Sequence, residues 1–419
     1  MAQAQGSSSK TYIGIERDAQ LASGTWGSGT LLSGAKGIFT PFKTNTIRKS
    51  VAQTLSQQIT ASRSPSAPAR GNVDIGGDIT AELDAGPHGL LWYLAAGNRA
   101  VLPVYLIATG AHSPAFVTGE LINTDAGGTH ARVVSAISGT GIYVTGITGG
   151  TFVENDVIIG ETSGGGATTA AAATSTVNGY LHEFWISDAL PSCIIEKQFM
   201  DIAQFFKYTG CMSNSIKLTV SPSGYAELSA SFMGKDETTA QTAFFVAGSS
   251  NLITVPSTTF DNFLVTVGEG ANGTYSTLTA LTEFSLEFNN NLDGSAVTIG
   301  GQGLRAGIAA GVPTVSGSMK ATFQDLTLYT KALNKTETGL RFTIANSLVP
   351  TGASGAERLR ITMPEVYLTP NAPSVDGPGG VYLDMQYGAF YGNETTTGRT
   401  TAFHVELWNS VPDYTDATA

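Results

Sequence analysis

Residues 281–291 read L-T-E-F-S-L-E-F-N-N-N, and this stretch decides the expected fold. Its apolar side chains, from Phe284 to Phe288, alternate with Glu283 and Glu287 on the opposite face. Alternation with a period of two is typical of a β-strand that has one face in a core and the other in water. The wet face of this strand carries two carboxylates in one row, so a surface lined by many copies of it would be acidic.

A second acidic-faced strand is expected over residues 73–85, which read V-D-I-G-G-D-I-T-A-E-L-D-A. Asp78, Glu82 and Asp84 share its polar face, opposite an apolar face of alternate residues. After Pro87, the sequence G-L-L-W-Y-L-A-A-G predicts one short helix that a glycine ends.

The composition of the whole chain favours the same fold class. The 419 residues are enough for two or three domains with a sizeable core. Charged residues make up 13%, aromatic residues 9%, and there are 50 glycines. Long amphipathic helical segments are hard to find, so we expect an all-β protein with many turns.

The charge balance argues against a protein that binds nucleic acid through its phosphates. The chain has 22 basic and 33 acidic residues, a net charge of −11. Phosphate binding rests on Lys and Arg, whereas an acidic surface repels a polyanion. Two cysteines, Cys193 and Cys211, are too few for a disulfide scaffold and fit a reducing compartment as small buried residues. No signal peptide and no apolar run of about 18 residues is evident, so we expect no membrane span.

Composition shifts divide the chain into segments. Residues 1–10 are small and polar and predict a flexible N-terminal arm. Residues 110–178, rich in Gly, Thr and Ala, predict a small β-module inserted between two strands of a parent domain and lying on its outer surface. The strand patterns of the first half return after residue 242. We therefore expect two tandem domains, 11–241 and 242–419, related by duplication.

Two loops are candidates for contact with a neighbouring subunit. Trp26 lies in a Gly-rich turn, where it either anchors a partner or simply packs. Residues 38–70 are expected to be weakly structured and end in the Pro/Ser-rich segment A-S-R-S-P-S-A-P-A-R-G. This segment contains Arg63 and Arg70 and lacks periodicity, which predicts a long loop.

Several blocks, taken in order, resemble the major tail tube proteins of long-tailed bacteriophages. They are V-D-I-G-G-D-I-T-A-E-L with L-L-W-Y-L, F-F-K-Y-T-G-C-M-S-N-S-I-K-L, F-S-L-E-F-N-N-N-L-D-G, V-S-G-S-M-K-A-T-F, L-R-I-T-M-P-E-V, G-G-V-Y-L-D-M-Q-Y-G-A-F-Y and V-E-L-W-N. The resemblance covers nearly the whole chain outside the inserted module, which is similar to small β-modules of other phage tail proteins.

The resemblance implies tandem β-sandwich or barrel domains whose inner sheets join neighbouring subunits into one tube. Rings would stack through long loops and the N-terminal arm. With two tube domains per chain, a ring of three chains has pseudo-sixfold symmetry, and a six-chain ring is the second option. The lumen would hold a tape-measure protein and, transiently, double-stranded DNA, and other tail proteins would bind the ends. The chain would assemble in the host cytoplasm into the tail of the virion.

The expected site is the wall of that conduit. A barrel of roughly two dozen strands is wide enough for duplex DNA, and an acidic wall lets the DNA slide. Lys320 would partly neutralise the wall, and the alternative is that these carboxylates lie on an ordinary outer face. The candidate lumen-facing carboxylates are Asp78, Glu82, Asp84, Glu283 and Glu287.

No motif predicts catalysis, a metal site or a cofactor. The histidines lack metal-ligand spacing, and the Gly-rich runs lack the lysine of a phosphate-binding loop. We therefore expect a structural protein rather than an enzyme. Two alternatives stay open: a virion surface or adhesion protein that binds carbohydrate, and a β-rich enzyme that degrades polysaccharide with paired carboxylates.

Overall fold

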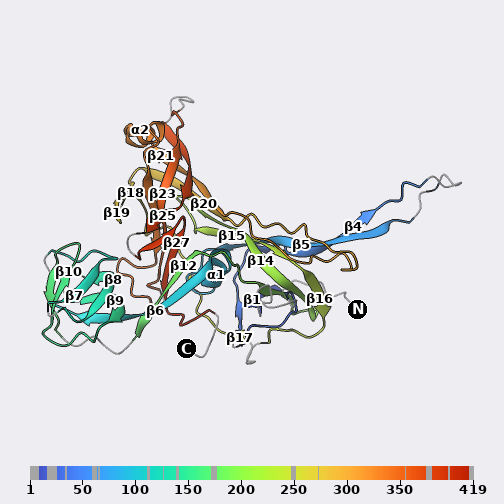
Figure 1. Ribbon diagram of the computed structural model, residues 1–419, viewed down its shortest axis with the longest axis horizontal. Helices are drawn as coiled ribbons and strands as arrows, with labels where there is room; N and C mark the ends of the chain where they lie inside the picture. Colours follow the sequence, from blue (N-terminus) through green and yellow to red (C-terminus); the bar gives the residue numbers. More distant parts are fainter. Residues whose placement is uncertain are drawn as a thin grey trace.

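In the computed structural model the described residues are 9–16, 26–33, 35–58, 64, 67–110, 114–125, 127–137, 141–170, 177–246, 252–271, 273–353, 355–373, 380–394 and 397–414. Over these residues the chain forms 27 strands and two short helices, so the expected all-β class is confirmed (Figure 1). Neither helix within these ranges is long and apolar enough to cross a membrane.

Eight strands form one continuous antiparallel sheet, here called the central sheet. In spatial order they are β4 (Arg48–Thr54), β5 (Ala69–Glu82), β15 (Glu227–Gly234), β14 (Gln204–Val220), β20 (Leu281–Asn289), β21 (Thr314–Thr322), β24 (Tyr382–Phe390) and β23 (Arg358–Thr369). The short β3 (Thr44–Asn45) also pairs with β5. Alternate residues of β15 and β20 are buried, as the period-two pattern predicts.

The central sheet contains an internal repeat. The order β4–β5–β15–β14 in the first half matches β20–β21–β24–β23 in the second half. A short helix follows the second strand of each set, α1 (Gly89–Ala96) after β5 and α2 (Thr327–Leu333) after β21. The two halves meet where β14 pairs with β20, with Ile216 opposite Phe288. The central sheet thus continues across the domain boundary that the sequence predicts between residues 241 and 242. That division into two domains stays a prediction.

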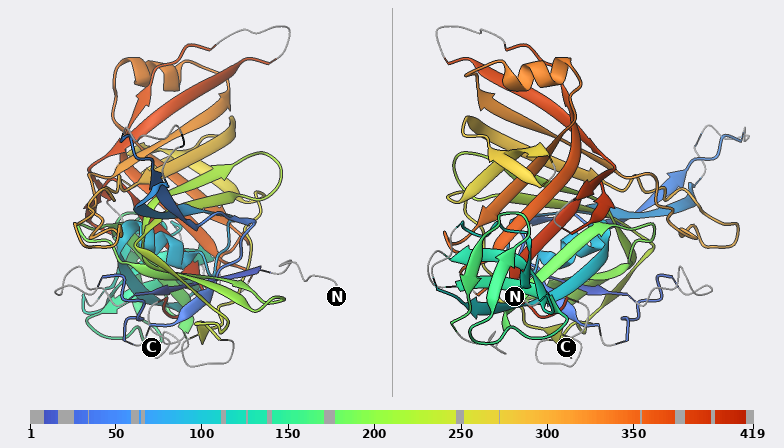
Figure 2. Two further views of the ribbon diagram at one scale, coloured as in Figure 1. Left: turned by 90° about the vertical axis from the view of Figure 1, so that its right-hand side faces the viewer. Right: turned by 60° about the vertical axis from the view of Figure 1, so that its left-hand side comes forward.

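A second sheet, the outer sheet, packs on the apolar face of the central sheet. Its order is β19 (Thr274–Thr277), β18 (Val265–Ala271), β22 (Thr338–Ala345), β23, β27 (His404–Asn409), β12 (Val177–Ile186) and β6 (Gly97–Ala108). The core between them is aromatic: Phe284 stacks on Phe342 at 5.2 Å and Phe288 on Phe403 at 4.9 Å. Figure 2 shows how the strands of the second half cross one another in the two sheets, with α2 at the far end of this part of the molecule.

The helix expected after Pro87 is α1, and it lies in this core. Seven of its eight residues are buried, and Gly97 ends it at φ +89°, a conformation that favours glycine. Further first-half strands extend from β14: β13 (Cys193–Phe199), β1 (Ser9–Ile15), β2 (Gly37–Phe39) and β16 (Asp236–Ala240). The short β17 (Leu252–Ile253), which follows residue 242, pairs with β2. Cys193 and Cys211 lie opposite each other on β13 and β14 as buried free thiols.

The inserted module is a small β-structure with its own core. It comprises β7 (Leu121–Thr124), β8 (His130–Ile137), β9 (Gly141–Thr148), β10 (Val157–Gly160) and β11 (Gly166–Thr168). Its core includes Ile122, Val144 and Phe152. The strand β9 pairs with β6, so the module continues the outer sheet at the end away from the β4–β5 hairpin (Figure 1).

The stretch over residues 38–70, expected to be weakly structured, forms strands over much of its described length, and much of the Pro/Ser-rich segment expected as a loop lies outside the described residues. The segment contains β2, β3 and β4, and β4 pairs with the first part of β5 to make a hairpin that projects from the body (Figure 1). Nearly every residue of β4 is exposed, so the strand shows no apolar alternation. Backbone hydrogen bonds with β5 hold β4 as a strand. The order of its side chains gives no sign of this pairing.

Candidate functional site

The central sheet presents one continuous face of polar side chains, here called the polar face. It consists of alternate residues within 78–82 of β5, 227–231 of β15, 215–219 of β14, 283–289 of β20, 314–320 of β21 and 384–388 of β24. Cross-strand pairing aligns them in rows that run through both halves of the chain. One row is Thr80, Ser229, Lys217, Glu287, Ser316 and Gly388. The next row is Glu82, Glu227, Thr219, Ser285, Ser318 and Gln386.

Carboxylates outnumber ammonium groups on this face. Lys320 lies 3.7 Å from Glu283, and Lys217 lies directly opposite Glu287. Such exposed pairs each contribute at most about 1 kcal/mol, so the excess of negative charge is not neutralised. The carboxylates are Asp78, Glu82, Glu227, Glu283, Glu287 and Asp384, and the lysines are Lys217 and Lys320. A third lysine, Lys43, reaches this face from just before β3 and pairs with Glu227 at 2.5 Å.

Between the charges the polar face carries small hydroxyl side chains. The hydroxyls of Ser285 and Ser318 are 2.8 Å apart across β20 and β21, and those of Thr80 and Ser229 are 3.4 Å apart. Short side chains leave the face even, and hydroxyls hold water rather than an apolar ligand. The arrangement suits contact with a hydrated, sliding partner better than tight binding.

Four of the five predicted carboxylates lie together on the polar face: Asp78, Glu82, Glu283 and Glu287. Sequence reasoning did not select Glu227 or Asp384. Both lie on strands with clear alternation, and the rows that bring them to this face arise from strand pairing, which the sequence does not show.

Asp84 was expected on the same face, and this prediction is wrong. The strand β5 ends at Glu82, and Asp84 is only 2% exposed. Its carboxylate accepts hydrogen bonds from the backbone N–H of Gly86 at 2.7 Å and from the hydroxyl of Ser257 at 2.5 Å. The backbone N–H of Asp84 donates to Nδ1 of His88 at 3.0 Å. The aspartate therefore holds the turn that leads into α1, and the alternation ends before it.

The proposed subunit contacts have mixed outcomes. Trp26 is 5% exposed and packs within its own chain against Leu190, Met212, Leu292 and Ile308, so packing is the correct interpretation. Arg63 lies outside the described residues. Arg70 is exposed on the projecting hairpin, and its contact with a neighbouring subunit stays a prediction.

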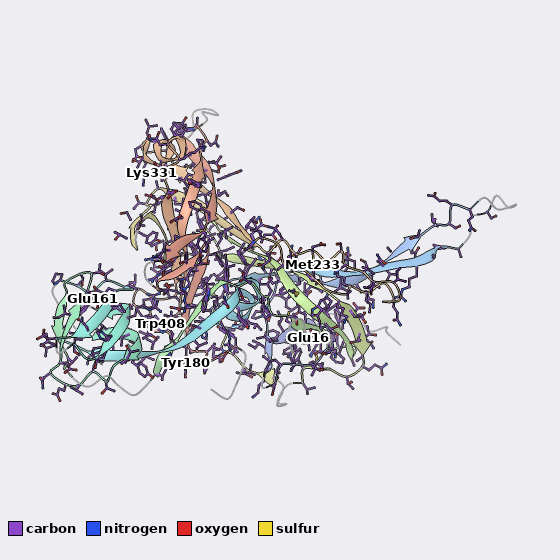
Figure 3. The ribbon with its side chains drawn as sticks, viewed as in Figure 1. Glu16, Glu161, Tyr180, Met233, Lys331 and Trp408 are labelled. Atoms are coloured by element: carbon purple, nitrogen blue, oxygen red, sulfur yellow. The ribbon has the colours of Figure 1, made fainter. Side chains whose placement is uncertain are left out.

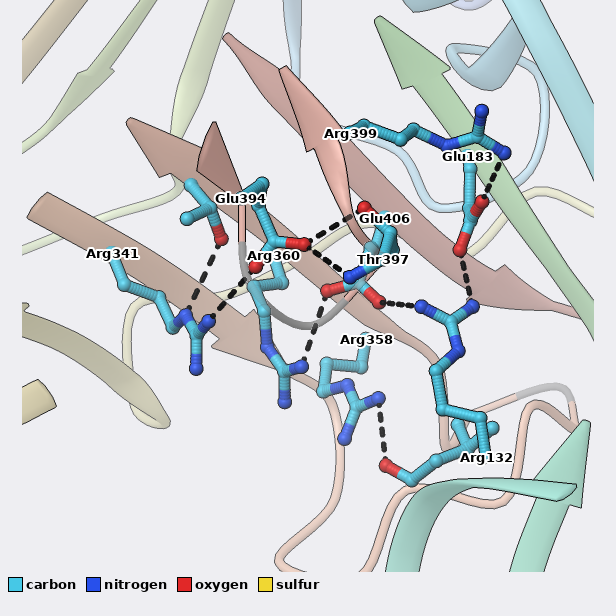
Figure 4. Close-up of polar contacts among 11 residues, drawn as sticks. Arg132, Glu183, Arg341, Arg358, Arg360, Glu394, Thr397, Arg399 and Glu406 are labelled. Carbon is cyan, nitrogen blue, oxygen red and sulfur yellow. Dashed lines mark hydrogen bonds and ion pairs between the residues drawn. The ribbon is translucent and has the colours of Figure 1, made fainter. Parts of the chain in front are cut away.

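A second charged group, here called the arginine cluster, lies on the outer sheet where it meets the module, and Figure 4 shows its polar contacts. Sequence reasoning missed it, because its members come from seven strands. The members are Arg132, Arg341, Arg358, Arg360, Arg399, Glu183, Glu394 and Glu406.

Ion pairs connect the cluster across the module boundary. Arg132 of the module pairs with Glu183 of β12 and lies 3.7 Å from Glu406 of β27. Arg360 also pairs with Glu406, at 3.1 Å, and Arg399 pairs with Glu183 at 3.0 Å. Burial alone raises the pKa of a carboxyl, but Arg360 and Arg132 hold the pKa of Glu406 well below its usual range.

Apolar contact accompanies these charges. Trp408 lies where the module meets the rest of the chain (Figure 3). Tyr143 of the module packs edge-on against its ring at 5.2 Å, and the guanidinium of Arg358 lies over the ring at 5.5 Å. The module is thus seated on the outer sheet by both ion pairs and aromatic packing.

Comparison with protein families decides between the classes considered. Residues 16–389 match the family described as phage tail tube protein. The chain belongs to this family. It is therefore a structural component of a phage tail and of the virion, as the resemblance implied. A search of curated protein sequences found no match. No group of three His, Cys, Asp or Glu side chains placed to hold a metal ion occurs within the described ranges.

Proposed function

We propose that this tail tube protein assembles into stacked rings whose polar faces line a conduit for double-stranded DNA. The observation that carries the proposal is the continuity of the polar face through both halves of the chain, with aligned rows and an excess of carboxylates. A tube wall needs a surface of this kind, because it must present one even lining around its whole circumference.

The charge of the polar face sets how the conduit works. Duplex DNA is a dense polyanion that binds to clustered Lys and Arg. On this face Lys217 and Lys320 are each placed next to a glutamate. The wall repels the DNA and holds a layer of water on its serine and threonine hydroxyls, so the genome slides during ejection into the host.

The internal repeat supports a ring of three chains. Within one chain, β14 of the first half joins β20 of the second half. The matching strand β23 has an edge at residues 367–369 that pairs with no strand of the described chain, and β3 and β4 pair only with β5. In the proposed ring β23 of one copy joins β3 and β4 of the next, repeating the β14–β20 joint. A six-chain ring is the second possibility.

Other partners follow from the conduit. The lumen holds a tape-measure protein before the DNA enters, and other tail proteins bind the two ends of the tube. Assembly takes place in the host cytoplasm. The projecting β4–β5 hairpin, including Arg70, reaches toward the neighbouring ring.

Electron cryomicroscopy of the purified protein at rising concentration tests the proposal. We expect stacked rings of three chains, with Glu283 and Glu287 facing the bore. A tube that carries the polar face on its outside would overturn the conduit, and six-chain rings would overturn the stoichiometry alone. A monomer at every concentration would contradict self-assembly and make a glycan-binding screen the next measurement.

A further inference from the structure

The two helices of the internal repeat differ in how far they are buried. Seven of the eight residues of α1 are buried, whereas Ala332 is the one buried residue of α2. Leu326, just before α2, is 58% exposed, and Leu333, its last residue, is 55% exposed. These leucines are about two helical turns apart and so lie on one face of the helix. An apolar helix face that is covered in one repeat and open in the other indicates a surface for a partner.

Part of the difference has a cause within the chain. The strands β6 and β12 contact α1, whereas in the second half residues 334–337 alone separate α2 from β22. The C-terminal end of α1 is covered in another way, by the second half of the same chain. The side chain of Asn290, directly after β20, donates hydrogen bonds to the carbonyl of Ala95 at 2.9 Å and to that of Ser213 at 3.0 Å. This contact lies at the joint where β14 pairs with β20.

The repeat relates this contact to the exposed end of α2. Counted from the first residue of each helix, Leu333 occupies the position of Ala95. Ala332 occupies the position of Leu94, and both of these residues are buried in their own halves. The two helices therefore have the same orientation toward the core, and Leu333 lies where the second half would receive a residue equivalent to Asn290.

The strand register identifies that residue. Residues 77–81 of β5 match residues 317–321 of β21, because both runs read glycine, polar, buried apolar, polar and buried alanine. Taken with the pairing of β4 to β5 and of β20 to β21, this match places Val51 of β4 where Asn290 follows β20. Val51 is 41% exposed in the single chain. Each half of the proposed contact is thus an apolar side chain open to water.

We propose that β4 of a second copy of the chain covers α2 in the ring, with its Val51 against Leu333. The contact rests on the proposed ring, in which β23 of one copy joins β3 and β4 of the next. It repeats between two copies the cover that Asn290 gives to α1 within one chain. Burial of two apolar side chains takes the place of the hydrogen bond to Ala95, so the contact stabilises the ring only when two copies meet.

Chemical cross-linking tests the contact in the assembled protein. Leu333→Cys combined with Val51→Cys should give covalent species that end at a closed ring when a short bismaleimide is added after assembly, as seen on a denaturing gel. The native Cys193 and Cys211 are buried and should not react. The control is Leu333→Cys combined with Val153→Cys, because Val153 is 50% exposed on the module and should give no link between chains.

The outcomes separate this contact from the conduit. Tubes that assemble without the cross-link would overturn the contact and leave the conduit in place, whereas a wild type that never assembles would overturn both. A link from Leu333→Cys to Ile299→Cys, in an exposed loop of the second half, would place α2 between stacked rings and overturn the proposal. So would tubes of the pure protein in which α2 stays uncovered, since another tail protein would then be its partner.

Substitution measures how much the contact contributes. Leu333→Asp should raise the protein concentration needed for half-assembly by about tenfold or more, because a carboxylate then faces an apolar neighbour. The Tm of the unassembled chain should match the wild type, since Leu333 is exposed there. Val51→Asp should give a similar loss, and Val153→Asp on the module should assemble like the wild type. Normal assembly of both contact variants would overturn the proposal.

Discussion

The polar face and the arginine cluster are two charged regions on opposite sheets of one subunit, and they differ in exposure and in sign. On the polar face the carboxylates are open to water and in excess. Lys320 lies 3.7 Å from Glu283, and both side chains are more than a third exposed. In the arginine cluster Glu406 and Arg360 are buried, and positive charge is in excess. Water screens the first set, whereas protein surrounds the second.

The difference teaches which charges hold the subunit together and which act on a partner. An exposed carboxylate can change sign at little cost in folding free energy. A buried carboxylate that compensates two arginines cannot be lost without leaving uncompensated charge in the protein. Three experiments test this contrast, in order of the expected effect on stability.

The largest effect is expected for Glu406→Gln. Loss of this carboxylate leaves Arg360 and Arg132 without their shared partner, and we expect a loss of about 3–5 kcal/mol in the free energy of unfolding. Chemical denaturation measures it, with Glu287→Gln on the polar face as the matched control at under about 1 kcal/mol. Equal losses in the two variants would break the comparison.

The same variant predicts a pH dependence. The pKa of Glu406 is lowered in the folded protein relative to its ordinary value of 4.5. Its stabilising contribution is therefore fully present above about pH 4.5 and is lost as the pH falls through the folded pKa. The gap in stability between wild type and Glu406→Gln should narrow as the pH falls below 4.5, and a constant gap would contradict the assignment.

An intermediate effect is expected when residues 110–177 are replaced by a short Gly/Ser linker. Tyr105 and Val177 are partners on β6 and β12, so a linker from residue 109 to residue 178 spans a short distance. We expect a loss of roughly 2–3 kcal/mol, because Trp408 loses the cover of Tyr143. Electron microscopy should still show tubes.

The control is Arg132→Gln in the full-length chain. This variant loses the ion pairs of Arg132 but keeps Tyr143 packed on Trp408, so it separates the two contributions to stability. If the deletion variant forms no tube at any concentration, the module lies at a subunit interface, and its expected place on the outer surface of the tube is wrong.

The smallest effect on stability is expected for Glu283→Lys combined with Glu287→Lys. Folding free energy should change by less than about 1 kcal/mol, and tubes should assemble, while genome ejection from the phage slows because DNA binds the new lysines. The matched control is Glu154→Lys with Glu161→Lys, the same charge change on exposed residues of the module. An unchanged ejection rate would contradict a repulsive wall at β20.

Local pattern was sufficient to predict the all-β class, the acidic-faced strands and α1, because alternation and turn-forming glycines depend only on neighbouring residues. The polar face was predicted only in part. Alternation places Glu283 and Glu287 on one side of β20, but strand pairing brings Glu227 and Asp384 into the same surface. Asp84 was misplaced because alternation does not mark where β5 ends.

The arginine cluster shows the limit of local patterns more sharply. Arg358 and Arg360 alternate on β23 like residues of a wet face, yet the module and the β25 (Gly392–Glu394)–β26 (Arg399–Thr401) hairpin help to bury them. The part of the module that covers these arginines lies more than two hundred residues earlier in the chain. The sequence around Arg358 and Arg360 therefore gives no indication that they are buried. The hydrogen bond from Arg358 to the carbonyl of Val134, the Arg132–Glu183 ion pair and the pairing of β6 with β9 show this coverage in the structure.

The β4–β5 hairpin behaves as a lever. Its seven-residue strand β4 spans roughly 23 Å, so a tilt of about 10° at its base moves its tip by about 4 Å, close to the spacing between paired strands. Several side chains hold the base: Arg305 donates to the carbonyls of Ile75 at 2.9 Å and Gly234 at 2.8 Å and pairs with Asp74, and Lys49 pairs with Asp236 at 2.7 Å. The direction in which the hairpin points is thus set by a few side-chain contacts at its base.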